Sequence, residues 1–376
     1  MKKILFSGLL LGLITGSGVL AQNDGIFETV TIPSYSQIPT TQVKGIVTEQ
    51  GQIKSQTKET KKDGVYSIPK AKVSNNIYEP IMNMLGKYKN QVKVIYSDID
   101  GIIVPENYNG LTYRDKVYTS FSKLSQNNIP FIFTTGRTFK EAKKAANQLE
   151  INPKYFITQN GAEITDSDGN ILYENTMNLY FRRKMNSEVN FFNYFYNQDL
   201  KIAFYQRGNV YTFTESNIPD LLDNPISIDR LSQIPKNAGI SKIKVYGKES
   251  HTLDIFKRYI QRHYKFLTIE TVSSNSIDIS MKTATKADAV KILSEKLNIG
   301  LENSAAFGYA QNDVDLMNLI RENGGLAIST DNSYQEVKDA SSYITKDLDS
   351  DGFAFAIDTI IGNNKILNSQ YFYMEN

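Results

Sequence analysis

Short β-rich runs alternate with amphipathic helical patterns from residue 92 onward, and this alternation constrains the fold more than any other feature. The runs are rich in β-branched and aromatic residues; they are VKVIYS, PFIFTT, KYFITQ, SAAFGY, GGLAIS and SSYIT. The helical patterns between and after them include YRDKVYTSFSKLSQ, TFKEAKKAANQL, TKADAVKILSEKL, NDVDLMNLIRE and GFAFAIDTII. Strands that alternate with helices predict an α/β fold, with a Rossmann-like parallel sheet covered by helices on both faces.

The alternation stops over residues 173–273. A long helical pattern there, NLYFRRKMNSEVNFFNYFYNQ, is followed by a hairpin pattern and then by strand, helix and strand patterns in SKIKVYG, SHTLDIFKRYIQRHY and KFLTIET. Such an order is typical of an α+β unit inserted into an α/β domain. We therefore expect a core domain over 92–172 and 274–376, with an inserted domain over 173–273.

The first residues, MKKILFSGLLLGLITGSGVLAQ, place two lysines before an apolar run that ends in small residues. This layout predicts a signal peptide over residues 1–21 and an exported protein, periplasmic or secreted, with no stable membrane span after cleavage. A retained membrane anchor is the alternative, although glycines and hydroxyl residues interrupt the run. The chain contains no cysteine, which excludes disulfides, thiolate zinc sites, cysteine nucleophiles and a lipid-modified cysteine.

Residues 22–91 are rich in Thr, Ser, Gln and Lys and show no sustained hydrophobic period. We interpret them as an N-terminal extension or linker that adds at most a hairpin. A spacer and an attachment to the cell envelope both remain open. The net charge is +2, and without Lys2 and Lys3 the 40 basic residues balance the 40 acidic ones. This balance provides no overall field for nucleic acid or anionic membrane.

Polar groups gather where the predicted strands end. In a parallel α/β sheet, ligands bind outside the carboxyl ends of the strands. Each motif alone has a plainer explanation, such as an Asp-Gly turn or a helix cap. Phosphate loops of the GxxxxGK or GxGxxG type are absent, which counts against nucleotide binding. The motifs are DIDG with Asp98 and Asp100, TTGR with Thr135 and Gly136, QNGA with Asn160, TKADA with Lys286, and GYAQND with Asn312 and Asp313.

In this order the motifs resemble those of haloacid dehalogenase superfamily phosphatases, in the Cof-like branch with a type IIB α/β cap. The resemblance covers about residues 92–362, with the cap between QNGA and Lys286, and includes the tail DNSYQEVKDASSYITKDLDSDG. It implies a Rossmann-like core and a cap that closes over the site. It also implies a Mg²⁺-dependent phosphomonoesterase that acts on small phosphorylated metabolites, chiefly sugar phosphates.

The resemblance assigns a role to each motif. Asp98 would be the nucleophile that forms an aspartyl-phosphate, and Asp100 would be the acid and base. Mg²⁺ prefers oxygen ligands and retained waters. The implied magnesium ligands are Asp98, Asp100 through its backbone carbonyl, Asn312 and Asp313, and the implied phosphate-binding residues are Thr135, Gly136, Asn160 and Lys286.

One position departs from the family pattern. The fourth motif usually reads GDxxND, but here it reads GYAQND, so Tyr309 stands where the metal-binding aspartate is expected. A phenol is neutral at pH 7 and is a poor Mg²⁺ ligand. Two interpretations follow. Either Asp313 and water complete the metal site and the enzyme is active, or the protein is a catalytically impaired envelope protein that binds phosphorylated ligands or a partner without turnover.

Overall fold

The chain forms two compact units, residues 1–71 and 72–376. The computed structural model describes residues 19–23, 26–30, 79–105, 115–214, 218, 221 and 225–374. In the first unit, β1 (Val19–Asn23) and β2 (Ile26–Val30) pair as an antiparallel hairpin. The rest of the expected signal peptide and most of the extension lie outside the described residues. None of the described helices is long and apolar enough to cross a membrane.

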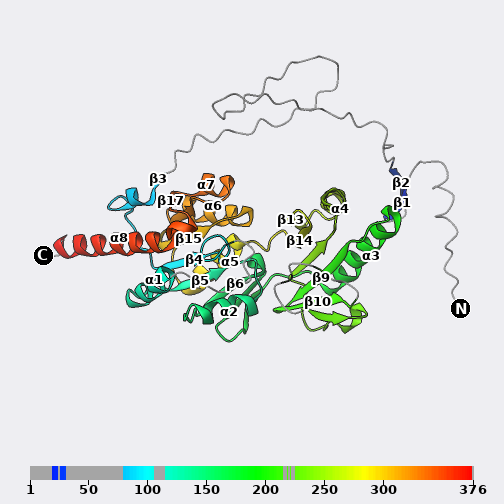
Figure 1. Cartoon of the computed structure of the whole chain (residues 1–376), viewed down its shortest axis with the longest axis horizontal. Coiled ribbons are helices and arrows are strands. Elements are labelled where there is room, and N and C mark those ends of the chain that lie inside the picture. Colours follow the sequence, from blue (N-terminus) through cyan, green and yellow to red (C-terminus); the bar gives the residue numbers. More distant parts are fainter. Residues whose placement is uncertain are drawn as a thin grey trace, which may run out of the picture. The chain divides into compact units, whose positions relative to one another are not determined.

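Nine strands form the core sheet, in the spatial order β3-β17-β16-β15-β4-β5-β6-β7-β8 (Figure 1). The pairs from β3 to β6 are parallel, and β7 and β8 are antiparallel. This confirms the predicted parallel α/β sheet. The strands are β3 (Glu79–Pro80), β4 (Val94–Ser97), β5 (Phe131–Thr134), β6 (Tyr155–Thr158), β7 (Glu163–Asp166), β8 (Ile171–Glu174), β15 (Ser304–Gly308), β16 (Leu326–Thr330) and β17 (Tyr343–Thr345). The edge strand β3 lies before residue 92, where the core was expected to begin. A strand of two residues has no readable hydrophobic period, so the sequence pattern could not indicate it.

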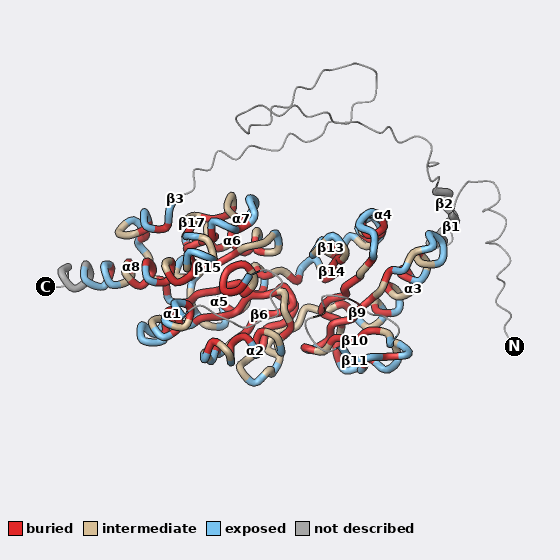
Figure 2. The backbone as a smooth tube through the Cα atoms, in the orientation of Figure 1, coloured by how far each residue is buried: buried red, intermediate tan, exposed pale blue. Residues whose placement is uncertain are grey.

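Helices cover both faces of this sheet. Side chains alternate between the faces along a strand, so Ile95 of β4 packs in one apolar cluster while Val94 and Tyr96 pack in the other. Figure 2 shows that the core between the helices is buried. The first cluster contains residues of α1 (Asp115–Gln126), α2 (Phe139–Gln148) and α8 (Gly352–Met374), and the second contains residues of α5 (Lys286–Leu297), α6 (Val314–Glu322) and α7 (Gln335–Ala340).

The insert, called the cap below, is built on a second sheet of six strands in the order β11-β10-β9-β12-β14-β13. Its apolar face packs against α3 (Leu179–Tyr196) and α4 (Ser250–His263). The expected insert boundary at residue 273 falls inside the β13–β14 hairpin, because antiparallel pairing with both neighbours brings β14 into this sheet. The strands are β9 (Lys201–Gln206), β10 (Asn209–Phe213), β11 (Ile226–Ile228), β12 (Lys242–Tyr246), β13 (Leu267–Ser273) and β14 (Ser276–Met281).

Strand β4 lies at the point where the strand order reverses. It pairs with β5 on one side and with β15 on the other. The strands that follow β4 directly in the sequence therefore lie on one side of it, and β15 and β16 lie on the other. A crevice forms at such a switch point, outside the carboxyl ends of the strands. Asp98 directly follows β4, and the polar motifs after β5, β6 and β15 end at the same edge.

Gly161 packs closely against the backbone at the start of α5, and we expect this position not to tolerate a side chain. Its φ is +95°, and a Cβ there would lie 2.0 Å from the carbonyl oxygen of Thr285. We expect Gly161→Ala to reduce the free energy of unfolding by about 3 kcal/mol, because backbone strain and overlap add. Urea unfolding would measure the loss. Gly86→Ala is the matched control: φ is +73° with nothing within 4 Å, so it should cost only about 1 kcal/mol. Equal losses would contradict the steric explanation.

Candidate active site

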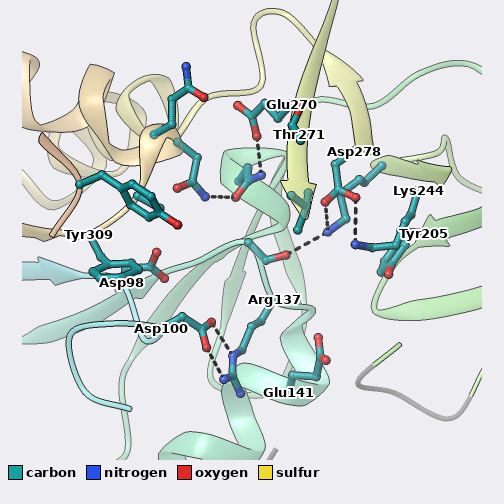
Figure 3. A pocket seen from close by; sticks show the side chains of 18 of the residues that line it. Asp98, Asp100, Arg137, Glu141, Tyr205, Lys244, Glu270, Thr271, Asp278 and Tyr309 are labelled. Atoms are coloured by element: carbon teal, nitrogen blue, oxygen red, sulfur yellow. Dashed lines mark hydrogen bonds and ion pairs between the residues drawn. The ribbon is translucent and has the colours of Figure 1, made fainter. Parts of the chain in front are cut away.

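A cavity of about 480 Å³ lies between the carboxyl ends of the core strands and the cap sheet (Figure 3). Five of the predicted site residues line it and therefore meet: Asp98, Asp100, Gly136, Asn160 and Asn312. Three others do not line it and are buried behind its wall: Thr135, Lys286 and Asp313. The cap contributes mainly charged and polar side chains: Tyr205, Lys242, Lys244, Glu270, Thr271 and Asp278.

Lys286 joins two carboxylates beneath the cavity. Its ammonium lies 2.7 Å from Asp98 Oδ2 and 2.7 Å from Asp313 Oδ1, and the residue is 1% exposed. Burial alone lowers the pKa of Lys286, but the two carboxylates outweigh it and the net pKa is raised. The lysine therefore stays charged. The other oxygen of Asp98 accepts the backbone N–H of Ile99 at 2.7 Å, so the carboxylate is held at both ends.

Asp313 organises the loop after β15. Its Oδ2 accepts the backbone N–H groups of Tyr309 at 2.8 Å and Ala310 at 3.1 Å, while its Oδ1 faces Lys286. Burial raises the pKa of Asp313 to about 6, against the lowering effect of Lys286. Both oxygens are thus engaged within the protein. In this geometry Asp313 supports the loop and the lysine, and its expected role as a metal ligand stays a prediction.

Asp100 is paired with Arg137. The guanidinium donates from Nε to Oδ2 at 2.9 Å and from Nη2 to Oδ1 at 2.6 Å, the two-bond geometry that fixes a carboxylate most firmly. Burial lowers the pKa of Arg137, but the pairing with Asp100 outweighs it and the net pKa is raised. Acid and base catalysis by Asp100 would require this pair to separate. Arg137 is the last residue of the TTGR motif at the end of a predicted strand, so its position indicated a site residue. The sequence did not indicate that it pairs with Asp100.

Asn160 is held in an unfavourable backbone conformation at the meeting point of core and cap. Its φ is 58°, and the preceding Gln159 has a φ of 53°. Non-glycine residues in this region are strained and cluster at functional sites. Its Oδ1 accepts from Asn312 Nδ2 at 3.0 Å, and its Nδ2 donates to Glu270 Oε2 of the cap at 3.3 Å. A Cβ on Gly136 would lie 2.7 Å from Asn160 Oδ1, so only glycine permits this approach.

The cap presents a row of charges to the cavity. In the sheet register Lys244 is opposite Asp278, and Asp278 is opposite Glu270. Asp278 Oδ2 lies 2.9 Å from the ammonium of Lys242, and Oδ1 lies 3.4 Å from that of Lys244. Burial raises the pKa of Asp278, but the two lysines outweigh it and the net pKa is lowered. Burial, and then the Asp278 charge, raise the pKa of Glu270.

These cap residues were missed by the sequence analysis. A signal was present, because Lys242 and Lys244 alternate with apolar residues in SKIKVYG, and Asp278 does so in SIDIS. Charges repeated at every second position of a strand indicate a polar face. The sequence did not show that this face is turned toward the core.

Tyr309 packs against the loop that carries the two aspartates. A Cβ on Gly101, whose φ is +74°, would lie 2.1 Å from Cγ of Tyr309, so the ring lies against the glycine. The ring also meets Tyr334 edge-on, with centroids 5.4 Å apart. Tyr309 lines the cavity, as Asp98 does (Figure 3). Its ring packs against Gly101 and Tyr334.

Comparison with known proteins identifies the family. Residues 95–357 match the haloacid dehalogenase-like hydrolases, which is more than half of the chain. The chain belongs to this family. Among curated relatives, the 5-amino-6-(5-phospho-D-ribitylamino)uracil phosphatase of Bacillus subtilis (strain 168) is 23% identical over 71% of this chain and 94% of its own length. A second phosphatase of the same organism is 22% identical over 70% of this chain and 98% of its own length.

A solved structure supports the same fold. The haloacid dehalogenase-like hydrolase from Bacteroides thetaiotaomicron superposes with a TM-score of 0.62 at 19% identity, over 72% of this chain and all of its own. The family resemblance seen in the sequence is thus confirmed, and so is the α/β core with its cap. The parts played by individual residues stay predictions.

The donor set of this haloacid dehalogenase-like hydrolase fits a weakly held hard cation. Among the described residues, no three His, Cys, Asp or Glu side chains converge as ligands. Oxygen donors are nevertheless present. Asp98 lines the cavity, and Asn312 Oδ1 is buried with no hydrogen-bond partner in the described part of the chain. An oxygen-only set suits Mg²⁺, with one carboxylate fewer because of Tyr309.

Removing Lys286 should expose the cost of the two buried carboxylates. Lys286→Met leaves Asp98 and Asp313 facing each other without a counter-ion, so we expect a loss of about 3 kcal/mol in unfolding free energy. The loss should shrink as the pH falls, because protonation of Asp313 removes the repulsion. Denaturant unfolding at several pH values would measure it. Lys291→Met, exposed on the same helix, should change little. If the two variants were equally stable, the ion cluster would not support the fold.

Proposed function

We propose that this hydrolase is a phosphomonoesterase that acts on small phosphorylated metabolites. The observation that carries the proposal is Asp98, a carboxylate held by the Ile99 N–H and by Lys286 that also lines the cavity. An oriented carboxylate in such a place is suited to nucleophilic attack. The curated relatives named as phosphatases support the same reaction.

The proposed reaction has two steps. Asp98 attacks phosphorus in line, forming an aspartyl-phosphate while the bond to the leaving oxygen breaks and Asp100 donates a proton to that oxygen. Water then attacks the aspartyl-phosphate, and Asp100 takes a proton from the water. Inorganic phosphate leaves and the Asp98 carboxylate is restored. Arg137 must release Asp100 for these transfers, because the pair engages both carboxylate oxygens.

The phosphate-binding residues fall into two groups. Gly136 and Asn160 line the cavity and would contact the phosphoryl oxygens directly. Thr135 and Lys286 are buried, and Thr135 Oγ1 accepts the backbone N–H of Arg137 at 3.2 Å. From these positions they would act chiefly by shaping the loop and by contributing positive charge beneath Asp98.

Mg²⁺ dependence belongs to the proposal as well. Asp98, the backbone carbonyl of Asp100 and Asn312 would hold the ion, and bound Mg²⁺ would offset charge on the phosphoryl group. Asp313, the remaining predicted ligand, would also hold Lys286 and the loop in place. Because Tyr309 supplies no carboxylate, we expect the affinity for Mg²⁺ to be low.

The cap would select the leaving group. Its cavity face offers ammonium donors on Lys242 and Lys244 beside carboxylate acceptors on Asp278 and Glu270. Mixed donors and acceptors suit a hydroxyl-rich leaving group, which agrees with the sugar phosphates that the family resemblance implies. Export, the signal peptide over residues 1–21 and envelope attachment through residues 22–91 also stay proposals, supported by the sequence pattern alone.

The nucleophile can be tested directly. Asp98→Asn should lower phosphate release from p-nitrophenyl phosphate by at least about a thousandfold, because the amide cannot form the acyl-phosphate. Asp315→Asn, an exposed acid on α6, should keep the wild-type rate. A panel of sugar phosphates, nucleotides and cofactor phosphates would then define the substrate. A wild-type rate in Asp98→Asn would exclude the proposed mechanism.

Tyr309 can be tested through metal binding. Tyr309→Asp restores a carboxylate, so the Mg²⁺ concentration at half-maximal rate should fall by about tenfold or more. Mg²⁺ should also raise the melting temperature of this variant more than that of the wild type. Tyr309→Phe keeps the ring on Gly101 and should behave like the wild type. An unchanged Mg²⁺ response in Tyr309→Asp would show that position 309 does not face the metal.

Tyr309 also favours a second function, the binding of phosphorylated ligands without turnover. The ring of Tyr309 packs where a metal-binding carboxylate is expected, which suits a protein that binds phosphorylated ligands without turnover. In that case inorganic phosphate or a sugar phosphate would raise the melting temperature, while the wild type would release no phosphate. Activity in Tyr309→Asp alone would then identify a retired enzyme.

A further inference from the structure

Cap and core also meet at a second place, away from the cavity around Asp98. The β9–β10 turn of the cap reaches the β7–β8 hairpin of the core. The backbone N–H of Arg207 donates to Glu163 Oε1 at 3.2 Å, and Arg207 Nη2 donates to Glu174 Oε2 at 3.4 Å. Beside them Lys140 of α2 donates to Asn209 Oδ1 at 2.7 Å. A separate cavity of about 450 Å³ lies here, lined by Glu163 and Arg207 among others.

The two glutamates face each other. In the register of β7 and β8, Glu163 is directly opposite Glu174, and like charges in such pairs repel. Glu163 is 1% exposed. Within the described residues, Glu163 Oε2 and Glu174 Oε1 are buried without a hydrogen-bond partner. The pair is therefore costly when both groups are ionised.

The protonation of Glu163 responds to this environment. The net pKa of Glu163 is raised from its ordinary 4.5 to about 7: burial and then Glu174 raise it, while the Ser241 hydroxyl and Arg207 lower it. Arg207 and Ser241 belong to the cap, whereas Glu174 belongs to the core hairpin. Movement of the cap away from the hairpin would bring water to Glu163 and return its pKa toward the ordinary value.

The direction of the pH effect follows from these two states. The closed cap binds the Glu163 proton more tightly than the open cap does. Proton binding therefore favours closure fully below about pH 4.5, and this contribution is lost as the pH rises to about 7. Above that pH the closed state retains an ionised acid buried beside Glu174.

We propose that Glu163, Glu174 and Arg207 form a pH-sensitive latch that holds the cap on the core in acid and releases it as the pH rises to neutrality. Release separates the cavity contacts as well, because Lys242 donates to the carbonyl of Gly136 at 3.3 Å and Asn160 donates to Glu270. The latch thus controls access to the site. It does not depend on phosphoryl chemistry and would operate equally in a protein without turnover.

The absence of cysteine makes the latch measurable. Two introduced cysteines, Lys144→Cys on α2 and Arg258→Cys on α4, are both exposed and would carry a donor and an acceptor dye. Energy transfer in the full chain would report cap opening from about pH 5.5 to about pH 8. We expect the closed-to-open ratio to fall on the order of tenfold over this range.

Three further variants test whether Glu163 is the group whose ionisation opens the cap. Glu163→Gln is neutral at every pH, so its cap should stay closed with no pH response. Glu174→Gln removes the opposing charge, so opening should require a higher pH, because the ionised Glu163 is then better tolerated in the closed state. Asp168→Asn, exposed on the turn of the same hairpin, should respond as the wild type does.

Each contrary result would overturn the proposal. An unchanged energy transfer in the wild type from about pH 5.5 to about pH 8 would show that the cap is not released. A pH response that persists in Glu163→Gln would place the titrating group elsewhere. If Asp168→Asn lost the pH response of energy transfer, the total charge of the hairpin would control opening, and not the buried pair of Glu163 and Glu174.

Discussion

The buried ammonium of Lys286 is the interaction on which the site depends. It joins Asp98 at the end of β4 to Asp313 in the loop before α6, and Lys286 itself opens α5. Charges without water must be paired, because breaking such a pair leaves an uncompensated charge. Three elements are therefore held in one arrangement. Asp313 extends that order to the backbone of the β15–α6 loop and so sets the position of Tyr309.

The departure at Tyr309 is accommodated by a glycine. Gly101 has a positive φ and no side chain, and this leaves the space against which the phenol ring packs. The tyrosine thus fits the fold, while it leaves the proposed cation site with one carboxylate fewer than the family pattern predicts. Among the described residues, the chain retains Asp98, its supporting lysine and a buried Asn312 oxygen without a hydrogen-bond partner. Weak Mg²⁺ binding, rather than a lost fold, is therefore the consequence we propose.

The cap is a sheet with two different faces. One face packs against α3 and α4, and the other turns buried charges toward the core. Buried charges are tolerated only where they are paired, as Lys242 and Lys244 are by Asp278. The same requirement applies at the hairpin latch, where the pairing is incomplete. A closed cap therefore has a cost that varies with protonation of Glu163, whereas the row around Asp278 is compensated.

The sequence by itself determined the α/β core, its strand ends and the gathering of Asp98, Asp100, Asn160 and Asn312. It did so because β-rich and helical periods are local, and because parallel strands place their carboxyl ends at one edge of the sheet. Only the tertiary structure decided that Arg137 pairs with Asp100, that β14 belongs to the cap, and that the cap row faces the site. The physical reason is that strand register and side-chain pairing join segments distant in the chain, and no local period encodes which distant charge will lie opposite.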